Sequence, residues 1–210
     1  MNLDTEIRAS LARRILAALE SAVPRSTARL RGSLAEGRAD QYSDIDVCWE
    51  VPDELLQASV ERLPKILSEV HPVESLRSEP GFQNSDKRRL IFVQFEGLPL
   101  FWRVDVDVFA QSIHGDREYD VHNEFARGDD WSPTHSALMN VIAAVKALLR
   151  NEEEEANQLL IRAFERVRLP VPELTPQELV LKLTESVAEM DPTKAGLARK
   201  IEEWHREAFD

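Results

Sequence analysis

Two short pairs of aspartates are the residues of this sequence best suited to chemistry. Asp44 and Asp46 are separated by one isoleucine. Asp105 and Asp107 alternate with valines in a second stretch. This alternation is typical of a β-strand, and it places both carboxylates of a pair on one face. Carboxylates that lie so close need a cation. Hard oxygen ligands suit Mg²⁺, which usually takes one or two carboxylates together with substrate phosphates.

A Gly-Ser pair precedes the first acidic pair and suggests a phosphate site. Gly32 permits close backbone approach, and Ser33 can hydrogen-bond a phosphate. Gly32 and Gly37 have the spacing of P-loop glycines, but Arg38 replaces the lysine and alanine replaces the hydroxyl residue, which argues against a P-loop. Ser33 and Glu36 also fit a capping box. A helix that starts here after a strand still offers free N–H groups to a phosphate.

The elements that must position these residues change in kind along the chain. Helical spacing, strand alternation and turn residues predict a mixed α/β segment over residues 1–128. From 129 to 210 only helices are predicted. The fold class is therefore α/β (α+β), with a mixed sheet flanked by helices and then a C-terminal helical domain. The predicted strands cover 27–32, 44–51, 89–95 and 100–109, and the predicted helices cover 5–23, 53–70, 134–150, 152–167, 176–190 and 192–208.

The composition excludes several classes of protein. With 43% hydrophobic residues, the 210-residue chain can bury a core. A net charge of −12 argues against non-specific nucleic-acid binding, which depends on Lys and Arg. The single cysteine, Cys48, excludes an intrachain disulfide and suits a reducing compartment. No apolar run is long enough to cross a membrane, and no secretory signal is present. We therefore expect a cytoplasmic protein with no membrane or nucleic-acid partner.

The spacing of these motifs resembles that of the nucleotidyltransferase superfamily, which has the polymerase-beta-like fold. The resemblance is carried by Gly32-Ser33, by Asp44-Ile-Asp46 and by the acidic strand over 104–108. The stretch GSLAEGRADQYSDIDV is especially similar to the bacterial branch with aminoglycoside and lincosamide nucleotidyltransferases and small antitoxin-type members. The resemblance implies a mixed sheet flanked by helices. It also implies a helical C-terminal domain like the one that closes the cleft in drug-modifying members.

The resemblance also implies a role for each motif. In the family, acids hold Mg²⁺, the Gly-Ser turn holds the triphosphate tail, and an NMP group moves to a hydroxyl with release of pyrophosphate. The implied metal-binding and catalytic residues, with two Mg²⁺ ions, are Asp44, Asp46 and Asp105. The implied nucleotide-binding residues are Gly32, Ser33 and Lys146. Further candidates are Asp107, as a rival third acid, and Arg38 and Glu96.

The sequence thus predicts a Mg²⁺-dependent nucleotidyltransferase. ATP is the default donor, although another NTP can replace it, and the acceptor is a hydroxyl of a small molecule such as an aminoglycoside-like antibiotic. The acidic net charge is compatible with a cationic acceptor. Two alternatives stay open: AMP transfer to a protein, as in antitoxin-type relatives, and a nucleotide-binding module without turnover. The identity of the acceptor, the preferred NTP and the oligomeric state stay open as well.

Overall fold

The computed structural model describes residues 3–209 and divides into two compact units. One unit ends at Asp130 and the other begins at Trp131. The first is mixed α/β and the second is helical. The predicted fold class is confirmed. No helix among the described residues is long and apolar enough to cross a membrane.

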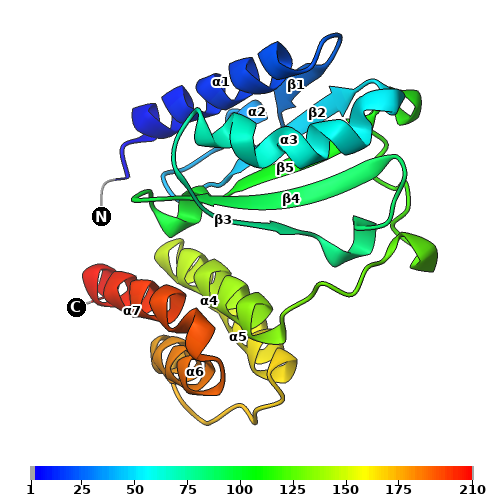
Figure 1. Ribbon diagram of the computed structural model, residues 1–210. Helices are drawn as coiled ribbons and strands as arrows, with labels where there is room; N and C mark the ends of the chain where they lie inside the picture. Colours follow the sequence, from blue (N-terminus) through cyan, green and yellow to red (C-terminus); the bar gives the residue numbers. More distant parts are fainter. Residues whose placement is uncertain (1–2, 210) are drawn as a thin grey trace. The chain divides into compact units, whose positions relative to one another are not determined.

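The first unit is built on a five-stranded mixed sheet with the order β1-β2-β5-β4-β3 (Figure 1). The central pair, β2 and β5, is parallel, and every other neighbouring pair is antiparallel. Three of the four paired aspartates therefore belong to the two strands that lie side by side in parallel, and Asp44 directly precedes β2. The strands are β1 (Thr27–Leu30), β2 (Ile45–Val51), β3 (Val73–Ser78), β4 (Arg88–Phe95) and β5 (Val104–Ala110).

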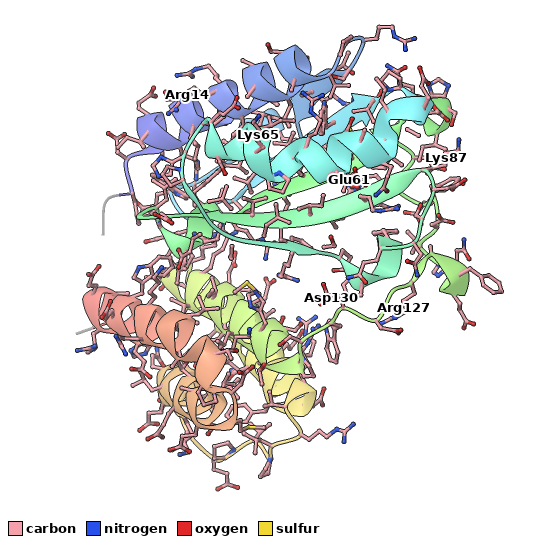
Figure 2. The ribbon with its side chains drawn as sticks, viewed as in Figure 1. Arg14, Glu61, Lys65, Lys87, Arg127 and Asp130 are labelled. Carbon is pink, nitrogen blue, oxygen red and sulfur yellow. The ribbon has the colours of Figure 1, made fainter. Side chains whose placement is uncertain are left out.

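One face of the sheet is covered by two helices, α1 (Thr5–Ala22) and α3 (Leu56–Ser68) (Figure 1). Alternate residues of the strands, such as Val47 on β2 and Val106 on β5, point to this side and are fully buried. Apolar side chains spaced along the two helices complete the core. The outer side of α3 is polar and carries Glu61 and Lys65 (Figure 2).

The same alternation sends charged side chains to the opposite face of the sheet. Asp46 on β2 pairs in register with Asp105 on β5, and Cys48 pairs with Asp107. Because these residues alternate with the core valines, their side chains share the face that α1 and α3 do not cover. The sheet therefore has one apolar face and one face with charged groups.

Several elements differ from the prediction. The segment 53–70 begins with a 3₁₀ turn, η1 (Asp53–Leu55), before α3, which contains Pro64. The segment over 73–86, which lies outside the strands and helices predicted above, contains β3 and the 3₁₀ turn η2 (Pro80–Phe82). Residues predicted to start the last strand form the 3₁₀ turn η3 (Leu100–Trp102). Pro99 precedes η3, and the turn buries three apolar side chains that period-2 alternation would have split between two faces.

The second unit consists of four helices and one 3₁₀ turn. Buried apolar residues on the helices, among them Leu138, Leu160 and Leu183, form its core. The third helix starts with a complete capping box, in which Thr175 and Glu178 satisfy each other's backbone N–H groups. The elements are α4 (Pro133–Leu149), α5 (Glu153–Arg166), α6 (Pro176–Met190), η6 (Pro192–Lys194) and α7 (Ala195–Phe209).

Three further 3₁₀ or α-helical turns belong to the first unit. The single-turn helix α2 follows β1 and carries the Gly-Ser pair. Two 3₁₀ turns follow β5 in the segment that leads to Asp130. Their bounds are α2 (Gly32–Ala35), η4 (Gln111–Ile113) and η5 (Glu124–Ala126).

Candidate active site

Three of the predicted acids lie together at the start of the two parallel strands. Asp44 immediately precedes β2, and Asp46 pairs in register with Asp105 of β5. Asp44 and Asp46 are half-buried, and Asp105 is almost fully buried. We call Asp44, Asp46 and Asp105 the carboxylate cluster. Its members come from separate parts of the sequence and meet because the central strand pair is parallel.

The electrostatics of the cluster show how closely its charges interact. Burial, followed by the charges of Asp44 and Asp105, raises the pKa of Asp46. The charges of Arg31 and Arg103 oppose this effect only in part. Burial is also the main reason why the pKa of Asp105 is raised, and the charge of Asp44 adds to it. The cluster therefore favours the approach of a cation.

The positively charged side chain of Arg103 pairs with the carboxylate cluster. Its Nε donates to Oδ1 of Asp105 at 2.5 Å, and its Nη2 donates to Oδ2 at 2.6 Å. This is the two-pronged geometry in which a guanidinium binds a carboxylate most strongly. Arg103 lies just before β5, so the period of the strand sends both side chains to the same face.

The absence of a side chain at Gly32 makes room for the carboxylate of Asp46. The residue has a φ of +57°, and a Cβ added there would lie 2.4 Å from Oδ2 of Asp46. A backbone hydrogen bond also joins the turn to β2: the amide of Arg31 donates to the carbonyl of Asp46 at 2.9 Å. The Gly-Ser turn is therefore fixed directly against the carboxylate cluster.

The capping box predicted for Ser33 and Glu36 is not formed. Helix α2 starts two residues earlier than the box implies, with Arg31 at its N-cap and no side-chain cap hydrogen bond. Glu36 is the C-cap residue, and its carboxylate pairs with Arg38. The chain turns sharply at Gly32, whose positive φ moves the start of the helix ahead of the serine.

The first backbone amides of α2 can donate to a ligand, because the first N–H groups of a helix have no acceptor within it. The first backbone bond of the turn is donated by Ala35 to the carbonyl of Arg31. The amides that precede Ala35 lie ahead of the hydrogen-bond ladder, as in any first helical turn. Ser33 is half-buried and lies among these amides.

Asp107, the rival third acid, has a different environment. Its side chain is 1% exposed, and both of its oxygens accept from Arg88, at 3.0 Å each. Oδ2 is also 3.0 Å from Nη2 of Arg31. Arg88 in turn donates to the backbone carbonyls of Arg117 and Tyr119. Asp107 is the centre of a buried ionic network that joins β4, β5 and the segment after β5.

The remaining predicted residues make contacts with residues outside the carboxylate cluster, or belong to the other unit. Arg38 is exposed and pairs with Glu36. Glu96 is exposed in the turn after β4, where its backbone carbonyl contacts Nε2 of His71 at 2.8 Å. Lys146 is a half-buried residue of α4 in the helical unit. Its proposed contact with the triphosphate stays a prediction.

Sequence reasoning missed the arginines that surround the acids. Arg103 and Asp105 are separated by one residue, so strand alternation alone could have placed them on one face. Arg31 directly precedes the Gly-Ser pair. Arg88 lies far from Asp107 in the sequence, and only the antiparallel pairing of β4 with β5 brings them together.

The side chains of the cluster suit a hard cation in type and placement. Their donors are all carboxylate oxygens, and the space beside Asp46 depends on the missing side chain of Gly32. Within the described residues, no three His, Cys, Asp or Glu side chains are grouped tightly enough to hold a metal by themselves. Asp105 is paired with Arg103. Mg²⁺ needs only one or two protein carboxylates when phosphate oxygens complete its shell, so Asp44 and Asp46 fit this ion.

Comparison with known families agrees with this arrangement. Residues 12–96 match the model of the nucleotidyltransferase domain. The match contains the Gly-Ser turn, Asp44 and Asp46, whereas Asp105 follows it. The predicted family is therefore confirmed for residues 12–96. No curated protein matches the chain.

Solved structures with similar folds include RNA-modifying enzymes. A cytoplasmic RNA terminal U-transferase is 17% identical with a TM-score of 0.38, over 69% of this chain and 39% of that one. The RNA terminal uridylyl transferase Cid1 is 17% identical with a TM-score of 0.41, over 84% and 47%. The polymerase core of TRAMP, an RNA surveillance complex, is 14% identical with a TM-score of 0.39, over 88% and 58%. The chain spans less than two thirds of each, and likeness at this level carries no argument about substrate.

Proposed function

We propose that this chain is a Mg²⁺-dependent nucleotidyltransferase that moves AMP from ATP to a hydroxyl of a small molecule and releases pyrophosphate. One observation carries the proposal. Asp46 and Asp105 lie side by side on adjacent parallel strands, and the Gly32 turn lies directly against Asp46. This arrangement supports the proposal, because carboxylate oxygens that suit a cation lie next to a turn that suits phosphates, and residues 12–96 match a nucleotidyltransferase domain.

The nucleotide would be bound at the junction of turn and cluster. The first amides of α2 and the Ser33 hydroxyl would donate to oxygens of the triphosphate tail. Asp44 and Asp46 would hold the Mg²⁺ that accompanies the nucleotide. A bound ion would neutralise the phosphate oxygens and fix the orientation of the tail. Another NTP would fit the same groups, because none of them contacts the base.

The transfer itself requires positioning more than covalent participation by the protein. The acceptor oxygen forms a bond to the α-phosphorus, while the bond from this phosphorus to the oxygen bridging to the β-phosphate breaks. Pyrophosphate leaves with that oxygen. The acceptor proton would pass to a base, and Asp105 is the candidate for this base. The alternative role of Asp105 is to bind a second ion.

Charge supports a small, polar acceptor. The chain has a net charge of −12, which is compatible with a cationic molecule and unfavourable for the backbone of a nucleic acid. The structural neighbours described above act on RNA, so the 3′ hydroxyl of RNA is the natural competing acceptor to test. A protein acceptor and binding without turnover are the remaining alternatives.

The first test measures nucleotide binding. We expect ATP with Mg²⁺ to raise the melting temperature more than ATP in EDTA or Mg²⁺ alone, because the two ligands share one site. A ligand at about 100 times its Kd adds about 2.7 kcal/mol to stability. Asp46→Asn should lose this shift. Glu50→Gln, a change of equal charge on the same strand, should keep it. Equal shifts with and without the metal would contradict the shared site.

The second test measures pyrophosphate release from ATP and Mg²⁺ with a panel of acceptors. The panel contains aminoglycosides and other small polyols, short RNA oligonucleotides and a protein mixture. Release that depends on a small molecule supports the proposal. Release only with RNA or only with protein would reassign the acceptor, and nucleotide binding without release from any acceptor would favour a binding module.

A further inference from the structure

The third acid of the cluster is already bound to a cation from its own chain. Both oxygens of Asp105 accept from Arg103, at 2.5 and 2.6 Å. The side chains are 26% exposed for Arg103 and 13% exposed for Asp105. Water therefore screens this pair less than it screens an ion pair at the surface. The oxygens that a metal would need are the ones that the guanidinium occupies.

Arg103 also faces the other two acids of the cluster. Burial acts against its charge, but the charges of Asp105, Asp44 and Asp46 outweigh burial and raise the pKa of the guanidinium. Arg103 is therefore attracted by all three carboxylates and not by Asp105 alone. A divalent cation that binds among these acids would be repelled by the charge of Arg103. It would also compete with Arg103 for the oxygens of Asp105.

The other contacts of Arg103 do not depend on Asp105. Its guanidinium carbon lies 4.7 Å from the centre of the Phe92 ring, and Phe92 pairs in register with Asp105. Arg77 lies over the same ring at 4.1 Å. A guanidinium above an aromatic face retains a favourable contact when its carboxylate partner is exchanged. Arg103 can thus give up Asp105 without becoming a buried, uncompensated charge.

We propose that Arg103 is a positioning residue that occupies Asp105 in the free protein and is exchanged for a divalent cation when the nucleotide binds. The inference rests on the proposed function, because it assumes that the metal-nucleotide complex binds at the carboxylate cluster. Free metal binds weakly, since it competes with Arg103. Metal with nucleotide binds more tightly, because the phosphates supply further ligands and a new anionic partner for the arginine.

The test is a titration of the full chain with Mn²⁺ alone, followed by the free ion's EPR signal. We expect Arg103→Gln to tighten Mn²⁺ binding to the nucleotide-free protein by about tenfold, because it removes a nearby like charge and frees Asp105. Arg29→Gln is the matched control. It removes the same charge from an arginine-carboxylate pair between β1 and β2, where Nη1 of Arg29 is 2.6 Å from Oε1 of Glu50. We expect less than about a twofold change for this control.

A double-mutant cycle separates exchange at Asp105 from a general effect of charge. In an Asp105→Asn background, Arg103→Gln should add little affinity, since the oxygen it frees is no longer a carboxylate. A gain of the same size in both backgrounds would overturn the exchange. Arg103→Lys keeps the charge but loses the two-pronged bond, so we expect a smaller gain than with Arg103→Gln. If Arg103→Gln does not fold in EDTA, the lysine variant carries the test.

The titration is repeated with a non-hydrolysable ATP analogue. Wild-type protein should bind Mn²⁺ much more tightly with the analogue than without it, and Arg103→Gln should reduce this ratio, because its affinity without nucleotide is already raised. Wild-type protein that binds Mn²⁺ in neither condition would refute the proposed function. Tight binding with the analogue, together with an unchanged affinity of free Arg103→Gln, would overturn only the role of Arg103.

Discussion

At the scale of single residues, Gly32 shows how one missing side chain shapes the candidate site. Its positive φ and the absence of a Cβ together let the chain turn against the carboxylate of Asp46. Gly37, a few residues later, has a φ of +68° but no atom within 4 Å of where a Cβ would lie. Both glycines have a positive φ, but only Gly32 has another side chain close to where its Cβ would lie. They therefore form a natural pair for mutation.

We expect Gly32→Ala and Gly37→Ala each to destabilise the protein by about 1–2 kcal/mol, the usual strain of a left-handed residue with a Cβ. Gly32→Ala should in addition lose ATP–Mg²⁺ binding, because its Cβ would push the carboxylate of Asp46 aside. Gly37→Ala should bind ATP–Mg²⁺ as wild type does. Chemical denaturation and nucleotide titration measure the two effects. Equal nucleotide affinity in both variants would show that the contact with Asp46 is unimportant.

The crowding of charges at Asp46 leads to a prediction about stability. Its pKa is raised in the folded state by burial and then by Asp44 and Asp105, so its ionised form destabilises the fold at neutral pH. That destabilisation fades as the pH falls through the raised pKa. In EDTA, Asp46→Asn should therefore melt at a higher temperature than wild type at neutral pH, and the difference should shrink in acid.

Asp53 is the control for the sign of this change in melting temperature. Hydrogen bonds from Lys87 and then from Ser112 lower its pKa, so its ionised form stabilises the fold above its unfolded pKa, and this contribution is lost as the pH falls. Lys87 lies 2.6 Å from Asp53 and is labelled in Figure 2. Asp53→Asn should melt at a lower temperature than wild type at neutral pH. A destabilised Asp46→Asn would contradict the picture of a strained carboxylate cluster.

At the scale of elements, the buried network around Asp107 connects strands and a loop. Its partners Arg88 and Arg31 come from β4 and from the residue after β1, and Arg88 reaches the backbone at Arg117 and Tyr119. A carboxylate that holds the buried guanidinium of Arg88 and the partly buried one of Arg31 is required by the fold, which explains a second acid on β5 without giving it a part in transfer. The motif Val-Asp-Val-Asp-Val thus contains one acid beside Asp46 and one that supports the fold.

We expect Asp107→Asn to destabilise the protein by about 3–5 kcal/mol, because it leaves the buried Arg88 and the partly buried Arg31 without their counter-charge. The folded fraction should still bind ATP–Mg²⁺, whereas Asp105→Asn should lose transfer with a smaller loss of stability. Glu50→Gln, whose partner Arg29 is half exposed, should cost at most about 1 kcal/mol. Denaturation curves and turnover per folded molecule decide the matter. An active Asp105→Asn beside an inactive, folded Asp107→Asn would exchange the two roles.

At the scale of the whole molecule, the carboxylate cluster and the Gly-Ser turn belong entirely to the unit that ends at Asp130. The helical unit has a core of its own and separate caps, such as the box at Thr175 and Glu178. We propose that the first unit binds the metal and nucleotide, and that transfer also requires the second unit, which contains Lys146. The division of labour can be tested by cutting the chain between the units.

A fragment that ends at Asp130 should fold and bind ATP–Mg²⁺, because it keeps every member of the cluster. It should lose transfer to any acceptor that the full chain uses. Circular dichroism checks folding, and nucleotide titration and pyrophosphate release check the two activities. In the full chain, Lys146→Ala should weaken nucleotide binding. Undiminished transfer by the fragment would show that the helical unit is dispensable.

The kinds of element and the main acids could be predicted from the sequence, because they depend on local rules. Alternation at period 2 identified β2 and β5 and placed Asp44 with Asp46, and helical spacing identified α4 to α6 nearly to their ends. The resemblance of a short motif was enough to predict the nucleotidyltransferase family. Local patterns failed at η3 and α2, where burial in the core and the positive φ of Gly32 override alternation and capping preference.

The contacts between charged groups could not be predicted from local patterns, because they depend on how the strands pair. The parallel pairing of β2 with β5 brings Asp46 beside Asp105, and the pairing of β4 with β5 brings Arg88 to Asp107. Strand order and register depend on how the whole apolar face packs under α1 and α3, and no local pattern contains that information. For the same reason the sequence left Asp105 and Asp107 equivalent, whereas the structure pairs one with the cluster and Arg103 and buries the other between two arginines.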